Sequence, residues 1–227
     1  MTLILAATAW PTNGALLADV HRLGYLRADD VVLDPTYGRG RWWTDWRPAQ
    51  LIAHDLVLDG VDFRRLPEET GTVDVVAFDP PYIAQGGRAT STLAGGHDEF
   101  GRRRADFLDR YGLYDVPKDV AGVIELMAAG IAEFYRVLRP GGLLLVKCMN
   151  YVTSGRYRRS AYDVLAHAEL LGFTLVDELV HLRRPGPQPQ RDYQHHARRN
   201  YSLLFVLRRD ARPWQQQLFD EASEVAP

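Results

Sequence analysis

Residues 73–82 read VDVVAFDPPY, and this stretch decides the fold. Its first six residues are mostly apolar and β-branched or aromatic, which is typical of a buried strand. Pro80 and Pro81 end the strand after Asp79, because proline has no N–H with which to continue a sheet. The stretch therefore predicts a core strand that stops abruptly at an acid, two rigid prolines and an aromatic ring, Tyr82.

Similar apolar runs occur on both sides of this strand and alternate with segments of helical spacing. Such alternation favours an α/β domain whose parallel sheet is covered by helices on both faces. The first helix is capped by Thr12 or Asn13 and ended by Gly24. We predict strands at Val31–Asp34, Leu51–Asp55, Val73–Asp79, Leu143–Lys147, Leu175–Leu182 and Ser202–Leu207, and further helices at Val120–Leu138 and Tyr162–Leu171.

The 227 residues provide one full core, and we predict a single domain over residues 1–212. Residues 83–118 form a long polar insertion rich in Gly and Arg, which we interpret as a substrate-recognition segment. Residues 213–227 form a C-terminal tail.

Composition excludes several classes of protein. Hydrophobic residues make up 46% and charged residues 25%, as in ordinary globular proteins, and no apolar run is long enough for a membrane helix. Cys148 is the one cysteine, and His195-His196 has no third ligand at metal spacing, so we expect no metal. A start without a positive n-region indicates no signal peptide, and the expected compartment is a reducing cytoplasm.

Charge is distributed unevenly along the chain. The formal net charge is −2, yet residues 147–209 hold eleven Lys or Arg against five Asp or Glu. A basic C-terminal third is compatible with a polyanion-binding face, and equally with a solvated arginine-rich surface.

Three predicted strands end in an aspartate: Asp34, Asp55 and Asp79. Ligands of open parallel sheets bind beyond the carboxyl ends of the strands. Gly38 and Gly40 follow the first of these strands and allow close approach of the backbone to a ligand. An acid after the second strand is placed to accept hydrogen bonds from ribose hydroxyls.

The segment Asp79-Pro80-Pro81-Tyr82 is the most specific of these features. Asp79 and the Pro80 carbonyl are acceptors, and the Tyr82 ring is flat. Together they suit a planar group with an exocyclic amine, because the acceptors bind the amine and the ring stacks on the base.

At these residues the sequence resembles the S-adenosylmethionine-dependent amino-methyltransferases that act on nucleic-acid bases. The motif of that family, Asp, Asn or Ser followed by Pro-Pro and an aromatic residue, is matched by Asp79 to Tyr82. Its cofactor loop is matched by Asp34 to Gly40, and its second-strand acid by Asp55. The resemblance covers roughly residues 10–150. It implies a Rossmann-like class I methyltransferase fold with a mostly parallel sheet and one antiparallel strand near the C-terminus.

The resemblance also implies roles for particular residues. Catalysis would fall to Asp79, Pro80, Pro81 and Tyr82. S-adenosyl-L-methionine, released as S-adenosyl-L-homocysteine, would be bound by Thr12, Asn13, Asp34, Pro35, Thr36, Gly38, Gly40, Asp55, Asp62 and Phe63. We expect the substrate to meet Tyr82, Arg156, Arg198, Arg199 and Asn200.

Two departures from the family shape further expectations. A long helix usually follows the cofactor loop, but only about ten residues separate Gly40 from the next strand, so this helix must be short or distorted. Trp42, Trp43 and Trp46 occupy that segment, and we interpret them as packing residues. No separate target-recognition domain is evident.

The expected reaction is methyl transfer to the exocyclic amine of a nucleic-acid base, with adenine N6 in DNA as the first choice. An RNA base and a protein side-chain amide are alternatives, because the same motif suits any planar amide. A non-catalytic binding subunit is a further alternative, although such a subunit would often have lost Asp79 or Tyr82. The basic C-terminal third favours nucleic acid over protein as the partner, and DNA over RNA is our preference.

Overall fold

The computed structural model describes residues 10–80, 117, 119–153, 155–182, 195–197 and 199–210. Its elements are α1 (Asn13–Arg22), β1 (Val31–Asp34), the 3-10 helix η1 (Arg41–Trp43), β2 (Gln50–Ala53), β3 (Val73–Phe78), α4 (Val120–Val137), β4 (Leu138–Cys148), β5 (Tyr151–Thr153), β6 (Arg156–Arg158), α5 (Ser160–Leu171), β7 (Phe173–Leu182) and β8 (Tyr201–Arg209). The predicted insertion at residues 83–118, except Pro117, and the predicted tail at residues 213–227 lie outside the described residues.

The six-stranded sheet has the order β2-β1-β3-β4-β8-β7. β2, β1, β3 and β4 pair in parallel, whereas β8 is antiparallel to both β4 and β7. This topology confirms the predicted fold class, a mostly parallel sheet with one antiparallel strand near the C-terminus. β1 and β3 are neighbours, so Asp34, the last residue of β1, and Asp79, which follows β3, lie at the same edge of the sheet.

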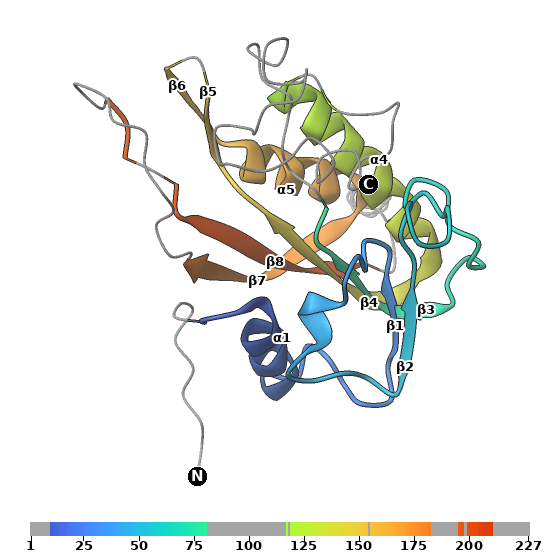
Figure 1. Cartoon of the computed structure of the whole chain (residues 1–227). Coiled ribbons are helices and arrows are strands. Elements are labelled where there is room, and N and C mark those ends of the chain that lie inside the picture. Colours follow the sequence, from blue (N-terminus) through green and yellow to red (C-terminus); the bar gives the residue numbers. More distant parts are fainter. Residues whose placement is uncertain are drawn as a thin grey trace, which may run out of the picture.

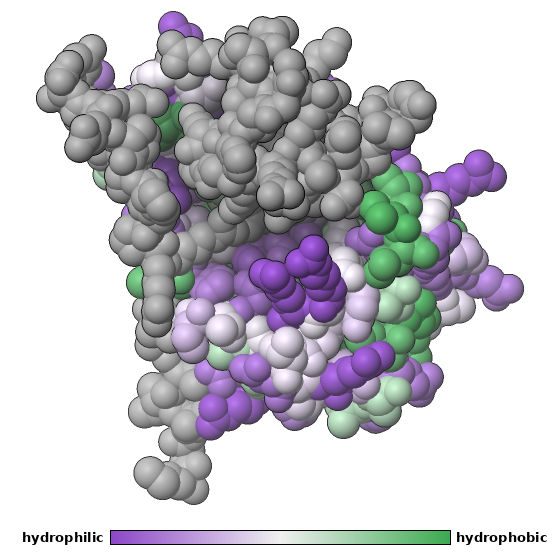
Figure 2. Space-filling view, in the orientation of Figure 1, coloured by the Kyte–Doolittle hydropathy of each residue, from purple (hydrophilic) through white to green (hydrophobic). Residues whose placement is uncertain are grey.

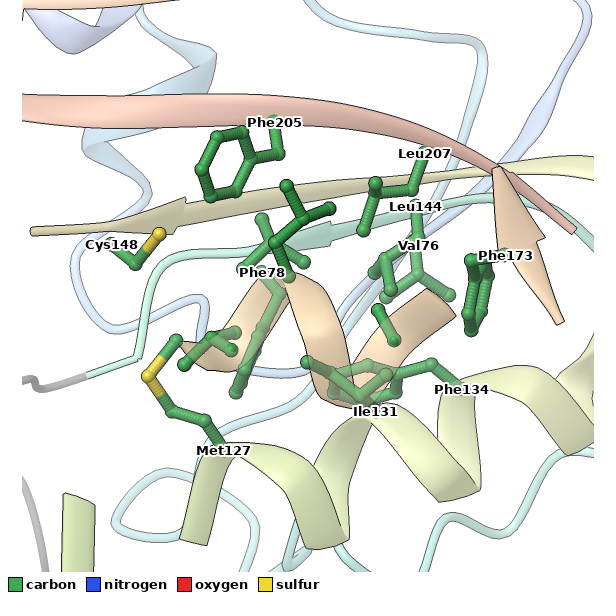
Figure 3. Close-up of a cluster of buried hydrophobic side chains, with 14 of the residues drawn as sticks. Val76, Phe78, Met127, Ile131, Phe134, Leu144, Cys148, Phe173, Phe205 and Leu207 are labelled. Carbon is green, nitrogen blue, oxygen red and sulfur yellow. The ribbon is translucent and has the colours of Figure 1, made fainter. Parts of the chain in front are cut away.

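Helices α4 and α5 cover one face of the sheet (Figure 1). Figure 3 shows Phe78 of β3 pointing from the sheet toward α4, where Met127, Ile131 and Phe134 meet it. The Phe78 and Phe134 rings pack edge to face with centroids 4.7 Å apart. This apolar layer is the main core of the domain.

The opposite face is covered by α1 and η1 (Figure 1). α1 contributes Leu16, Leu17 and Val20, and Trp42 and Trp43 fill the remaining space as buried rings. η1 is three residues long, which confirms that only a short helix fits between β1 and β2. The tryptophans do pack, as interpreted from the sequence, but they also have a second role described below.

Several element ends shift by one or two residues, so that β2 ends at Ala53 rather than at Asp55, and two larger features depart from the predicted elements. β4 begins at Leu138 rather than at Leu143, with a register irregularity where it pairs with β3. Gly142 makes this possible, because a Cβ at that position would lie 2.9 Å from the backbone oxygens of Arg139 and Asp74. The second feature is a two-stranded antiparallel ribbon, β5–β6, that the sequence analysis did not predict.

Within the described residues, no helix is both long and apolar enough to span a membrane.

Candidate functional site

The alternation of side chains along each strand brings three ionic groups to one face of the sheet. Asp34 shares its face with Val32, and Val32 belongs to the α1 layer. Phe78 of β3 pairs with Val146 of β4, and Asp79 and Lys147 are the next residues along the chain from this pair. They therefore lie side by side on the face covered by α1 and η1, the face with fewer helices.

Asp34 is a buried acid with both oxygens hydrogen-bonded. Its Oδ1 accepts from the Thr36 backbone N–H at 3.0 Å, and its Oδ2 accepts from Trp43 Nε1 at 2.7 Å. Burial raises the pKa of Asp34 to about 7 against the opposing effect of these two bonds, and the charges of Asp79 and Asp55 raise it further. Three carboxyl groups therefore interact electrostatically at this edge of the sheet, and a cation placed among them would relieve their repulsion.

Asp79 is held by two donors on one oxygen. Trp42 Nε1 donates to its Oδ2 at 2.8 Å, and Lys147 Nζ lies 3.5 Å from the same atom. The backbone N–H of Asp79 donates to Thr36 Oγ1 at 3.1 Å, which links the ends of β3 and β1. Asp79 is a quarter exposed, and its Oδ1 bonds to no other described residue, so that oxygen is able to accept from a ligand.

Lys147 is buried at the end of β4, with 2% of its side chain exposed. Its ammonium donates to Asn13 Oδ1 at 2.7 Å and lies 5.9 Å from the centre of the Trp42 ring. A buried ammonium is costly unless it is paired and hydrogen-bonded, as here. Asn13 thus connects the first residue of α1 to the acid on β3.

The loop after β1 requires glycine at two positions. Gly38 and Gly40 have φ values of +53° and +64°, in the left-handed region that other residues rarely adopt. A Cβ on residue 40 would also meet the Tyr37 hydroxyl at 2.5 Å. The glycines predicted for close backbone approach therefore shape a tight turn over the carboxyl end of β1.

Asp55 lies beside this loop, just beyond β2. Its Oδ2 accepts from Gly38 N at 3.1 Å and its Oδ1 from Val57 N at 2.9 Å. These bonds orient the carboxylate and leave further lone pairs for a ligand. Leu56, Val57 and Leu58 follow as exposed apolar residues, and Figure 2 shows hydrophobic surface beside β2 and the loop after it.

The remaining residues predicted to contact the cofactor make local structural contacts. Thr12 caps α1 by accepting from Ala15 N at 3.1 Å. Asp62 binds the Arg64 guanidinium, a hydrogen bond that lowers the pKa of this acid despite its partial burial. Phe63 packs against Phe78 in the main core, with ring centroids 5.1 Å apart. Pro35 continues the turn after Asp34, and Pro80 is buried.

The residues predicted to contact substrate fall into two groups. Arg156 is exposed on β6, whereas Arg199 and Asn200 are half-buried just before β8. Pro81, Tyr82 and Arg198 lie outside the described residues.

Sequence reasoning missed Trp42, Trp43 and Lys147 as members of the site. The signal for Lys147 was present, because it is a lone cation at the end of the apolar run LLLVK, at the edge where the acids were expected. The indole N–H donors were harder to predict, because only the tertiary structure brings each ring next to the acid that it binds. Within the described part of the chain, no group of three or more His, Cys, Asp or Glu is placed to hold a metal ion.

No protein-family model matches the sequence, and no curated protein matches it. Solved structures are similar in fold. A Thermus thermophilus protein, a candidate DNA modification methylase in complex with S-adenosyl-L-methionine, is 16% identical over 66% of this chain and 54% of that one, with a TM-score of 0.43.

TrmN from Thermus thermophilus is 18% identical over 86% of this chain and 48% of its own, with a TM-score of 0.48. A candidate methyltransferase from Bacillus halodurans is 13% identical over 86% of this chain and 99% of its own, with a TM-score of 0.44. The chain spans about half the length of each of the two Thermus proteins. Identities this low indicate likeness of fold alone.

Proposed function

We propose that the protein is an S-adenosylmethionine-dependent methyltransferase that methylates the exocyclic amine of a nucleic-acid base, with adenine N6 in DNA as the substrate. One observation carries the proposal. Asp79 ends β3 beside Asp34 at the end of β1, and its carboxylate is fixed by Trp42 and Lys147 with Oδ1 left to accept. In the sequence Asp79 is followed by Pro80, Pro81 and Tyr82.

The residues around the loop after β1 suit this cofactor. Asp55 follows β2, where an acid in this kind of sheet accepts hydrogen bonds from vicinal ribose hydroxyls, and Gly38 N and Val57 N hold its carboxylate. Asp34 and Asp55 interact electrostatically, and this pair of carboxyl groups suits a cationic ligand that carries a sulfonium and an ammonium group. When bound, S-adenosylmethionine supplies an electrophilic methyl group and leaves as S-adenosyl-L-homocysteine.

The chain's own contribution is to position the amine. An aromatic amine is a poor nucleophile because its lone pair is delocalised into the ring. Asp79 Oδ1 and the Pro80 carbonyl accept the two amine hydrogens, which favours a lone pair on nitrogen directed at the methyl group. Asp79 Oδ1 is also placed to take the proton that the nitrogen releases. Positioning of this kind supplies up to about 7 to 11 kcal/mol of barrier reduction.

Trp42 and Lys147 act through Asp79. Both donate to Oδ2, so they fix the rotation of the carboxylate and the direction of Oδ1. Tyr82, in the place where the family motif has its aromatic residue, would stack on the base, a contribution of about 1 to 3 kcal/mol.

The test is methyl transfer from labelled S-adenosylmethionine to separate pools of unmethylated DNA, RNA and protein. We expect transfer to DNA by the wild type, and a loss of at least about a hundredfold in kcat for Asp79→Ala. Lys147→Met should also lower kcat, because Trp42 is then the one described donor left to fix the rotation of the carboxylate. Calorimetry should show that both variants keep their affinity for the cofactor.

Substitution of Arg27 by Ala, an exposed residue before β1, is the matched control and should leave transfer unchanged. Robust transfer by Asp79→Ala, or transfer by the wild type only to protein, would overturn the assignment.

A further inference from the structure

Two residues separate the end of β4 from the β5–β6 ribbon, so the ribbon rises from the same edge of the sheet as Lys147 and Asp79. Its strands pair Tyr151 with Arg158 and Thr153 with Arg156. Figure 1 shows the ribbon projecting away from the sheet, with the segment that leads into β8 (red) running to one side of it.

The base of the ribbon is anchored. Asn150 is buried, and its Oδ1 accepts from Ala161 N of α5 at 3.2 Å. Ser160 Oγ donates to the Met149 carbonyl at 3.0 Å. These bonds tie the ribbon to the first turn of α5, so its direction relative to the sheet is fixed.

The surface of the ribbon is strongly basic. Arg156, Tyr157 and Arg158 are all exposed. No acid occurs between Lys147 and Asp163 in the sequence, and none occurs between Asp192 and Asp210. The cations on these two segments therefore lack acidic neighbours in sequence, and each segment carries a net positive charge.

The segment before β8 adds to this surface. The Arg199 guanidinium carbon lies 4.5 Å from the centre of the Tyr157 ring, which is a cation–π contact. Arg199 Nε is buried and has no hydrogen-bond partner among the described residues.

We propose that the β5–β6 ribbon and Arg199 form an arm that binds the phosphate backbone of DNA next to the base held by Asp79. The inference rests on the proposed function, because it takes DNA as the substrate. Charge complementarity identifies the partner: Arg156, Arg158 and Arg199 present guanidinium groups, which bind phosphate oxygens in a bidentate manner. The start of the ribbon is fixed by its bonds to α5, so the ribbon sets the distance between the DNA phosphates that it binds and the methylation site.

The experiment measures binding of the full chain to a fluorescent DNA duplex between about 50 and 200 mM salt. Each phosphate contact contributes about 0.9 to the slope of log affinity against log salt concentration. Arg156→Ala/Arg158→Ala should lower that slope by about two and weaken binding by about tenfold at the low-salt end. Both side chains are exposed, so the thermal unfolding midpoint should not change.

Two further variants test whether the salt slope depends on the charge at residues 156 and 158 or on the total charge of the chain. Arg156→Lys/Arg158→Lys keeps both charges and should keep most of the slope. Arg22→Ala/Arg27→Ala removes two charges that precede β1, at the opposite edge of the sheet, and should keep the wild-type slope. A single-stranded DNA and an RNA duplex of the same sequence complete the set.

The proposal that this arm binds DNA phosphates would be overturned by an unchanged salt slope for Arg156→Ala/Arg158→Ala. An equal decrease of the slope in the Arg22→Ala/Arg27→Ala control would overturn it as well. Tighter binding of RNA than of either DNA, with the same dependence on Arg156 and Arg158, would overturn DNA as its partner. Failure of the proposed function is separate, because it appears as absent methyl transfer while the difference in salt slope remains.

Discussion

The two faces of the sheet are covered in different ways. Toward α4 and α5, aromatic and aliphatic side chains such as Phe78 and Phe134 interlock in a deep apolar layer. Toward α1, one helix and three residues of η1 provide the cover, and indole rings fill the rest. Asp34, Asp79 and Lys147 all lie on this second face. The difference teaches that the larger apolar layer lies on one side of the sheet and the ionic chemistry on the other.

The largest expected effect on stability is on the α4 face. Phe134→Ala removes a fully buried ring that contacts Phe78, and we expect a loss of about 3 to 5 kcal/mol in the free energy of unfolding, measured in urea. Phe134→Leu, which keeps much of the volume, should cost less. A loss below about 1 kcal/mol for the alanine variant would contradict the division of roles between the two faces.

On the α1 face, stability should depend on pH through Asp34. Its pKa of about 7 in the folded protein lies above the value near 4 of an unfolded chain. The stabilisation from its protonated form is therefore complete below about pH 4 and is lost as pH rises through about 7. We expect a slope of at most about 1.4 kcal/mol per pH unit in urea unfolding.

Asp34→Asn should remove this slope between about pH 4 and 7. His54 also makes the free energy of unfolding depend on pH, above about pH 6.5. Hydrogen bonds to Asp59 and Glu68 raise the pKa of this histidine against the effect of burial. That contribution has the same sign and should survive in Asp34→Asn. An identical pH profile for Asp34→Asn and the wild type would show that Asp34 ionises as an ordinary carboxyl group.

The smallest effects should distinguish the two indole donors. Trp43→Phe leaves the buried Asp34 without one of its donors, which should cost about 1 to 3 kcal/mol of stability. Trp42→Phe removes the donor to Asp79, an acid that water reaches, and should cost less in the same urea titration. A greater loss of stability for Trp42→Phe than for Trp43→Phe would contradict the interpretation that the bond from Trp43 to Asp34 matters more for the fold.

Much of the fold could be predicted from the sequence because apolar runs report burial directly. The runs at β1 and β3 predicted both strands, and the helical spacing of apolar residues predicted α4. The ribbon was missed although its turn contains Ser154-Gly155, a common turn pair, because strands of three residues carry little periodic signal.

The acids of the candidate site could be predicted from the sequence, whereas the groups that donate hydrogen bonds to these acids could not. Asp34, Asp55 and Asp79 stand at strand ends, and strand order alone gathers them. Trp43 and Lys147 reach them from segments 9 and 68 residues away from Asp34 and Asp79, respectively. Such long-range contacts depend on packing that residue type and spacing do not specify.

The bonds from Trp42 and Trp43 to the acids have a spectroscopic consequence. Indole emission responds to the electric field around the ring, and here each N–H is bonded to a carboxyl group of the candidate site. Two of the five tryptophans of the chain are therefore intrinsic fluorophores in contact with that site. Subtraction of the emission of Trp42→Phe and of Trp43→Phe from that of the wild type would isolate their signals, and a cationic ligand that binds there should change them without a label.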